Sequence, residues 1–129
     1  MALTIEVANR SGAKIDADAL SALARRVLTS EGVEDGDLGL ALVGPEEIRR
    51  LKREHLELDE PTDVLAFPVD GRDELPTGLP RQLGDVVICP QVVGDGWRQS
   101  LVHGLLHLLG HDHGAAMERR ERRYAEARA

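Results

Sequence analysis

Residues 97–109 constrain the fold more than any other part of the chain. This stretch predicts a helix that is nearly apolar all round apart from His103 and His107. A helix that is hydrophobic on every side is stable in water only when protein surrounds it. We therefore expect this helix to be buried.

The other elements follow from hydrophobic periodicity and from the positions of glycine and proline. The predicted strands span residues 3–7, 38–43, 63–69 and 85–89. The predicted helices run from Asp16 or Asp18 to Gly32, from 45 to about 55, from 97 to 109 and from 118 to 128, with a loop at 70–82 and a turn at 90–96. We expect one α+β domain over residues 1–129, with a small mixed four-stranded sheet packed with about four helices and covered mainly on one face.

The composition is that of a small globular protein with a single core. A chain of 129 residues fits one domain. Its net charge of −7 counts against a broad, non-specific grip on nucleic acid, which normally needs a basic surface. Arginine-rich segments at 25–26, 49–53 and 119–123 leave room for local basic patches. One Trp, one Tyr and one Phe argue against an RNA-binding sheet built on aromatic stacking.

The sequence shows no secretory or membrane-spanning segment. No cationic start leads into an apolar run of about 7–15 residues, and no apolar run approaches the ~20 residues of a bilayer span. The single cysteine, Cys89, has no partner for a disulfide within the chain. These features predict a cytoplasmic protein with no membrane partner.

Four of the five histidines fall within residues 103–113, on and just after the buried helix. His103 and His107 are one helical turn apart and project from the same face. Zinc binds imidazole nitrogen at ~2.0–2.1 Å, so two rings placed in this way can share one ion. Without a metal, buried imidazoles in a leucine-rich region would each need a hydrogen-bond partner. The pattern therefore favours a metal site.

The third ligand depends on where the helix ends. His111 continues the helical pattern, but on a straight helix it lies ~12 Å along the axis from His103. Gly110 readily adopts the left-handed backbone conformation that ends a helix. The chain can then double back and bring His113 over the first two ligands. We therefore predict one Zn²⁺ per chain, held by His103, His107 and His113.

The ligand spacing matches the extended zincin pattern H-E-x-x-H-x-x-G-x-x-H in everything except the glutamate. Gly104 occupies the position of that glutamate, which is the general base in metallopeptidases. Glycine cannot move a proton, which argues against ordinary peptide hydrolysis. Structural zinc sites usually have four protein ligands and often use cysteine, whereas three protein ligands with water in the fourth position is the catalytic arrangement. Three histidine ligands and a single cysteine in the chain therefore favour a catalytic over a structural zinc site.

Three segments carry a likeness to a known family: HGLLHLLG at 103–110 followed by Asp112-His113, PTDVLAFP at 61–68, and GDVVIC at 84–89. Through these segments the chain resembles the YbeY family of bacterial endoribonucleases. They occur in the order typical of that family, and the histidine motif with glycine as its second residue is the most specific of the three. The likeness runs from about Leu38 to His113.

This resemblance implies an activity and a set of partners. It implies a zinc-dependent, single-strand-specific endoribonuclease that acts in 3′-end maturation of small-subunit (16S) ribosomal RNA and in ribosome quality control. The implied partners are ribosomal RNA and the small ribosomal subunit. By motif position, the zinc ligands carry over to His103, His107 and His113.

The chain departs from the family pattern in two places. The family has an arginine shortly before the segment Pro61-Thr62-Asp63, whereas residues 54–60 contain none, and Arg53 and His55 are the nearest possible replacements. The second departure is length, because only 13 residues separate Cys89 from His103. Family members usually carry a longer stretch here.

The sequence does not assign the general acid or the general base, and it leaves two alternative functions possible. Asp63 and Asp85 can orient a ligand or water, or serve as turn carboxylates, and His111 can carry a proton near the metal or lie at the surface. Asp112 can hold a ligand imidazole in one tautomer, or cap the following helix. The alternative functions are a metallopeptidase-like zinc hydrolase and a non-enzymatic, ribosome-associated module with a structural zinc.

Overall fold

The computed structural model describes residues 2–56, 64–76, 78–111 and 114–126. Its strands are β1 (Leu3–Asn9), β2 (Gly36–Leu42), β3 (Val64–Pro68) and β4 (Gln82–Ile88). They form one sheet in the order β1-β2-β4-β3, in which β3 is antiparallel to β4 and the other pairs are parallel. The predicted α+β class and the mixed four-stranded sheet are therefore confirmed.

Four longer helices lie in the described ranges, as expected. They are α1 (Ala17–Ser30), α2 (Pro45–Leu56), α4 (Trp97–Leu108) and α5 (Ala115–Glu126). The Asp16 side chain caps α1 by accepting hydrogen bonds from the backbone N–H groups of Asp18 and Ala19, at 3.0 and 3.1 Å. None of the helices among the described residues has the length and apolar character needed to span a membrane.

Three differences from the sequence-based expectation are the largest, while the ends of β1, β2 and β3 shift by one or two residues. The predicted turn over residues 90–96 contains α3 (Pro90–Val93) and the 3₁₀ turn η1 (Gly94–Gly96), because proline is well tolerated in a first helical turn. The final helix starts at Ala115, and the backbone N–H of Glu118 already donates to Gly114 O at 3.0 Å. The last strand starts at Gln82, where it pairs with Asp37 of β2.

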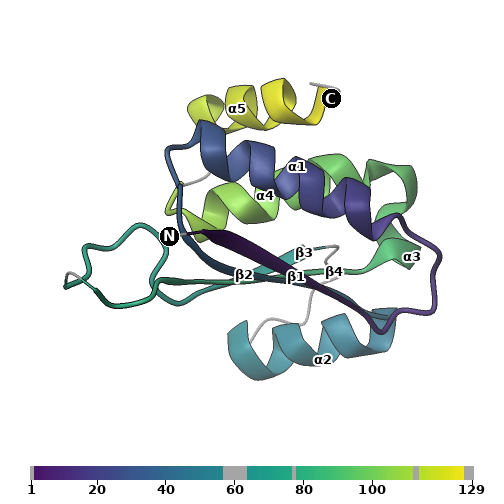
Figure 1. The fold of residues 1–129 in the computed structure, drawn as a ribbon. Helices are drawn as coiled ribbons and strands as arrows, with labels where there is room; N and C mark the ends of the chain where they lie inside the picture. Colours follow the sequence, from purple (N-terminus) through teal and green to yellow (C-terminus); the bar gives the residue numbers. More distant parts are fainter. Residues whose placement is uncertain (1, 57–63, 77, 112–113, 127–129) are drawn as a thin grey trace.

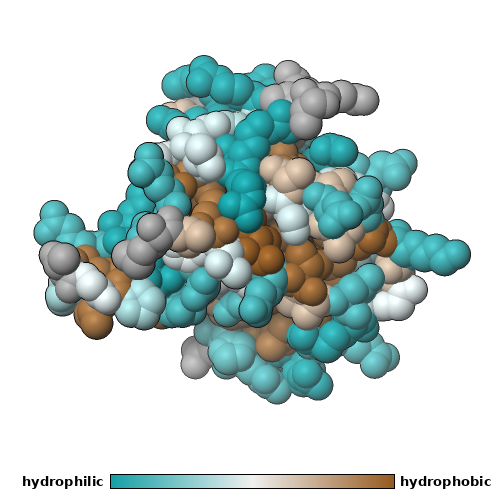
Figure 2. Space-filling view, in the orientation of Figure 1, coloured by the Kyte–Doolittle hydropathy of each residue, from teal (hydrophilic) through white to brown (hydrophobic). Residues whose placement is uncertain are grey.

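The helices cover both faces of the sheet, with most of the apolar core on one side. Helices α1 and α4 pack on one face, α5 lies outside them, and α2 covers the other face (Figure 1). Figure 2 shows mainly hydrophilic groups over α5 and α2, with apolar groups exposed in the band between them. The largest wholly buried side chains of α4 are Leu101, Leu105, Leu106 and Leu108. The prediction that this helix is buried is therefore confirmed.

Gly104 lets α4 approach the sheet closely. A Cβ atom at this position would lie 2.7 Å from Val86 Cγ1 and 2.9 Å from Val64 Cγ2, both shorter than real Cβ contacts. Val86 belongs to β4 and Val64 to β3, so the helix crosses both strands at this glycine. The residue that interrupts the zincin pattern is thus also a packing requirement.

Helix α4 ends in a left-handed turn at Gly110, where φ is +91°. The Gly110 N–H donates to His107 O and the His111 N–H to Leu106 O, each at 3.0 Å. These two bonds are those of a Schellman motif, which satisfies the last carbonyl groups of a helix and redirects the chain. The predicted helix end at Gly110 is confirmed.

Replacing Gly104 with alanine is expected to destabilise the protein. Overpacking typically costs about 1–3 kcal/mol, while the gain in helix propensity from Gly to Ala is about 1 kcal/mol. Because the added Cβ atom would clash with two methyl groups, the cost should lie in the upper part of that range. We therefore expect a net loss of about 1–2 kcal/mol in the free energy of unfolding, measured by urea denaturation. In a Val86→Ala background the nearest clashing methyl group is gone, so the loss should shrink. An equal loss in both backgrounds would show that the contact with Val86 is not the cause.

Candidate metal centre and adjoining cleft

The two described members of the predicted ligand set lie side by side on α4. The ring centroids of His103 and His107 are 4.6 Å apart, and their planes meet at 74°. Both residues are partly buried, and their spacing of one helical turn places them on one face. Paired imidazoles are a donor set that suits zinc.

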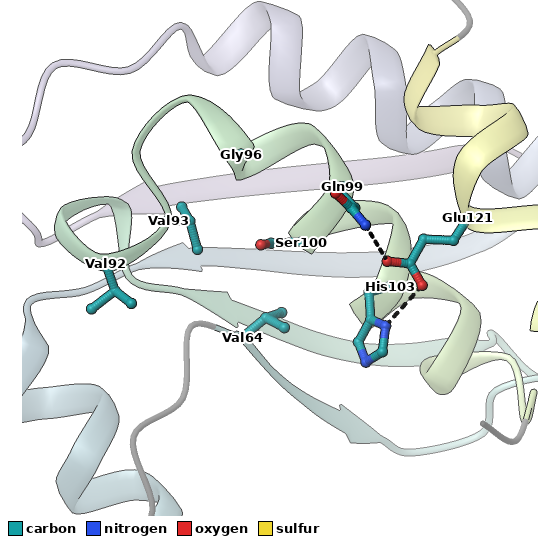
Figure 3. A pocket seen from close by; sticks show the side chains of 8 residues that line it. All are labelled: Val64, Val92, Val93, Gly96, Gln99, Ser100, His103 and Glu121. Atoms are coloured by element: carbon teal, nitrogen blue, oxygen red, sulfur yellow. Dashed lines mark hydrogen bonds and ion pairs between the residues drawn. The ribbon is translucent and has the colours of Figure 1, made fainter. Parts of the chain in front are cut away.

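A cleft of about 410 Å³ opens beside His103 (Figure 3). It is enclosed by residues from β3, from α3 and η1, from α4 and from α5. One wall is apolar and carries three valines, while the opposite side carries amide, hydroxyl, imidazole and carboxylate groups. The lining residues are Val64, Val92, Val93, Gly96, Gln99, Ser100, His103 and Glu121.

Glu121 of α5 reaches across to the histidine helix. Its Oε2 atom lies 3.0 Å from Nδ1 of His103, and its Oε1 atom accepts a hydrogen bond from Nε2 of Gln99 at 3.2 Å. The Glu121 side chain is only 12% exposed, so water screens these contacts little. A carboxylate on one ring nitrogen is typical of histidines that bind a metal through the other nitrogen. His103 and His107, with Glu121 behind one of them, are therefore a partial donor set of a kind that suits zinc.

Three of these residues also border a second cleft of about 350 Å³. Gln99, His103 and Glu121 line both cavities. Since the carboxylate of Glu121 joins the other two side chains, this trio forms the boundary between the clefts. An elongated ligand that passed from one cleft to the other would cross His103.

A second carboxylate, Glu31, ties the end of α1 to α5 and to the segment after Gly110. Its side chain is 3% exposed and accepts hydrogen bonds at 2.7 Å from the Tyr124 hydroxyl, from Arg120 and from Nε2 of His111. Burial alone would raise the pKa of Glu31, but the hydrogen bonds from Tyr124 and His111 and the charge of Arg120 outweigh it and lower that pKa.

The contact with Glu31 shows where the side chain of His111, one of the catalytic candidates, lies. His111 was a possible proton carrier near the metal, and the structure places its Nε2 atom against Glu31 at the end of α1. The imidazole therefore helps to fasten the turn that follows α4. Its Glu31 contact is a structural one.

The other predicted site residues divide into two groups. His113, Asp112 and Asp63 lie outside the described residues. Within the described ranges, no three histidine, cysteine or acidic side chains gather closely enough to hold a metal ion. The proposed third ligand, His113, thus stays a prediction.

Asp85 lies on the face of the sheet opposite α4. Its neighbour Val86 faces Gly104 of α4, and successive side chains of a strand alternate between faces. The Oδ1 atom of Asp85 lies over Gly39 of β2, where it would meet any added Cβ atom. The structure does not bring Asp85 to the histidines.

Arg53 and His55, the candidate replacements for the family arginine, lie on α2, on the face of the sheet opposite α4. His55 is exposed on α2, and its ring packs edge-on against Phe67 with the centroids 5.4 Å apart. Phe67 packs against the small core beneath α2. Arg53 is exposed on the same helix.

Sequence reasoning missed both carboxylates that hold this region together. Glu121 lies four residues after Met117 and three before Tyr124, so it shares a helix face with two residues that pack on the core. An acidic residue on the apolar face of a helix could have indicated a partner. Glu31 sits at the C-terminal end of α1, where the helix dipole disfavours a carboxylate.

The fold and the histidine pair define a small α+β domain with a candidate metal centre, and relatives place it in a family. A model of the family described as Endoribonuclease YbeY matches residues 5–128. A protein named Endoribonuclease YbeY from Salinispora tropica is 38% identical over 146 residues, covering 98% of this chain and 93% of the relative. A namesake from Nocardia farcinica is 34% identical and covers 98% and 78%. The chain belongs to the YbeY endoribonuclease family, which supports a role as a nuclease.

A solved structure supports the fold. A Thermotoga maritima protein with a known solution structure aligns with a TM-score of 0.54 and 24% identity, covering 94% of this chain and 87% of the other. At this identity the likeness concerns the fold alone. It agrees with the sheet and helix arrangement described above.

Replacing Glu31 with glutamine is expected to cost about 1.5–3 kcal/mol at neutral pH, since hydrogen bonds to charged groups contribute this much. A carboxylate with a lowered pKa binds fewer protons when folded, so its contribution is present above the ordinary value near 4.5 and is lost as the pH falls below it. The difference from the wild type should therefore narrow on acidification. Urea denaturation at several pH values measures it, with the exposed Glu34→Gln variant as the control. A gap that is constant down to pH ~3 would contradict the account.

Proposed function

We propose that this chain is a zinc-dependent, single-strand-specific endoribonuclease of the cytoplasm that acts on 16S ribosomal RNA during 3′-end maturation and ribosome quality control. The observation that carries the proposal is the pair of adjacent imidazoles on α4, of which His103 lines a cleft and has Glu121 behind it. Membership of the YbeY endoribonuclease family supports the choice of RNA as substrate.

His103, His107 and His113 would hold the ion. Zinc supplies Lewis-acid chemistry and activates water near neutral pH. The reversal at Gly110 supports the choice of His113, because the chain turns back directly after the helix that carries the other two ligands. The contact of Glu121 with Nδ1 of His103 supports metal binding through the other ring nitrogen.

The cleft offers a place for one nucleotide of an unpaired strand. Its volume of about 410 Å³ lies within the range of ~300–1,000 Å³ that is common for small-ligand sites. Val64, Val92 and Val93 provide apolar surface for a base or a sugar, and Gln99 provides an amide. Bases in single-stranded RNA can leave the stack and enter such a pocket, whereas those in a duplex stay paired. This supports a preference for single strands.

The packing of α4 against the sheet gives a second argument against peptide hydrolysis, in addition to the argument from the sequence. A glutamate at position 104 would have to fit where even a Cβ atom meets Val86 and Val64. The chain therefore has no room for the general base of the metallopeptidases on this turn of the helix.

Zinc stoichiometry separates the ligands from their neighbours. We expect His107→Ala to abolish stoichiometric zinc binding, because it removes one of three ligands. His111→Ala should retain most of it, because His111 contacts Glu31. Elemental analysis of the folded variants provides the measurement. Loss of zinc in His111→Ala together with retention in His107→Ala would refute the ligand assignment.

The reaction itself is tested with zinc-loaded protein and three substrates. We expect cleavage of single-stranded segments in a 16S 3′-end precursor, little cleavage of a matched duplex, and none of casein. The His103→Ala variant serves as the inactive control. Cleavage of casein would instead support a peptidase. Absence of any cleavage, with unfolding on zinc removal, would support a structural zinc in a ribosome-associated module.

A further inference from the structure

We propose that Glu121 is a positioning residue for His103, because its carboxylate fixes the ring tautomer that can bind a metal. The inference rests on the proposed function, since it takes His103 as a ligand. It adds a role for α5, which contributes none of the predicted ligands. The geometry of three side chains carries it.

The hydrogen bond defines where the proton of the ring lies. An ionised carboxylate can only accept hydrogen bonds, so Nδ1 of His103 donates to Oε2 of Glu121 across 3.0 Å. A neutral imidazole carries one N–H group, so its Nε2 atom then has the lone pair that a metal requires. Figure 3 shows this second nitrogen on the side of the ring away from Glu121.

The carboxylate is itself held in place. Gln99 lies one turn before His103 on α4 and donates to the other oxygen of Glu121 at 3.2 Å. The two oxygens of Glu121 therefore bind two side chains of the same helix face. A carboxylate fixed at both oxygens restricts the rotation of the His103 ring more than a singly bonded one would.

Helix α5 supplies a firm base for Glu121. One turn earlier, Met117 is 3% exposed within the main core. One turn later, the Tyr124 hydroxyl donates to Glu31 at 2.7 Å. Glu121 thus lies between two anchored residues of its own helix, and its side chain is 12% exposed.

If the contact between Glu121 and His103 served only to dock α5 on α4, a different result would be expected from substitution of Glu121. Glutamine at position 121 keeps the shape and an acceptor oxygen, so docking should survive. Its amide group can also donate, which allows the opposite tautomer with the proton on Nε2. Glu121→Gln therefore separates control of the tautomer from docking, whereas Glu121→Ala removes both.

The test reads the tautomer and the zinc affinity separately. Nitrogen-15 NMR of the metal-free protein at pH ~8 should show His103 almost wholly as the Nδ1–H form in the wild type and as a mixture in Glu121→Gln. Competition with a chromophoric zinc chelator should show a ~10–100-fold loss of affinity in Glu121→Ala, the range known for such partners, and a smaller loss in Glu121→Gln. The exposed Glu118→Gln, one turn earlier, should match the wild type in both.

The outcomes distinguish this inference from the proposed function. The inference is overturned if both Glu121 variants keep the wild-type tautomer and affinity while His103→Ala loses zinc. If His103→Ala binds zinc as tightly as the wild type, the ligand assignment fails and the inference fails with it. Should Glu121→Ala not fold, Glu121→Gln carries the test, and an unchanged His103 tautomer in that variant contradicts the inference.

Discussion

The close contact between α4 and the sheet at Gly104 is the constraint on which the rest of the structure depends. It places the helix against Val64 and Val86 at distances that no other residue allows. The leucines of the same helix fill the main core, so its position and rotation are fixed by burial of apolar surface. His103 lies directly before this glycine in the chain and borders the cleft. Packing therefore positions the candidate ligands.

Two carboxylates complete the site with polar contacts. Glu31 joins the end of α1 to His111 and to α5, and Glu121 joins α5 to His103 and Gln99. Helix α5 is mostly charged, so little apolar surface is available to dock it. Its attachment relies on these contacts together with a few apolar residues. Since both carboxylates bind the histidine segment or its helix, the docking of α5 and the geometry of the site are coupled.

The sequence predicted the features that depend on local order along the chain. Periodicity located the strands and the longer helices, the apolar pattern of α4 predicted its burial, and Gly110 predicted the helix end. It could not predict contacts made across 18 to 93 residues, such as Glu121 with His103 or Glu31 with Tyr124. These depend on how α5 docks, which no local pattern determines. Asp85 stood out by its motif, yet the alternation of β4 turns it to the other face.

We propose that three imidazoles meet on one ion where α4 ends and the chain reverses. Zinc K-edge X-ray absorption of the loaded protein tests this most directly, because it reports the type, number and distance of the ligands. We expect three histidine nitrogens at ~2.0–2.1 Å from the zinc and no sulfur ligand. A sulfur ligand at ~2.3 Å, which would bring in Cys89, or a shell with fewer than three imidazoles would contradict it.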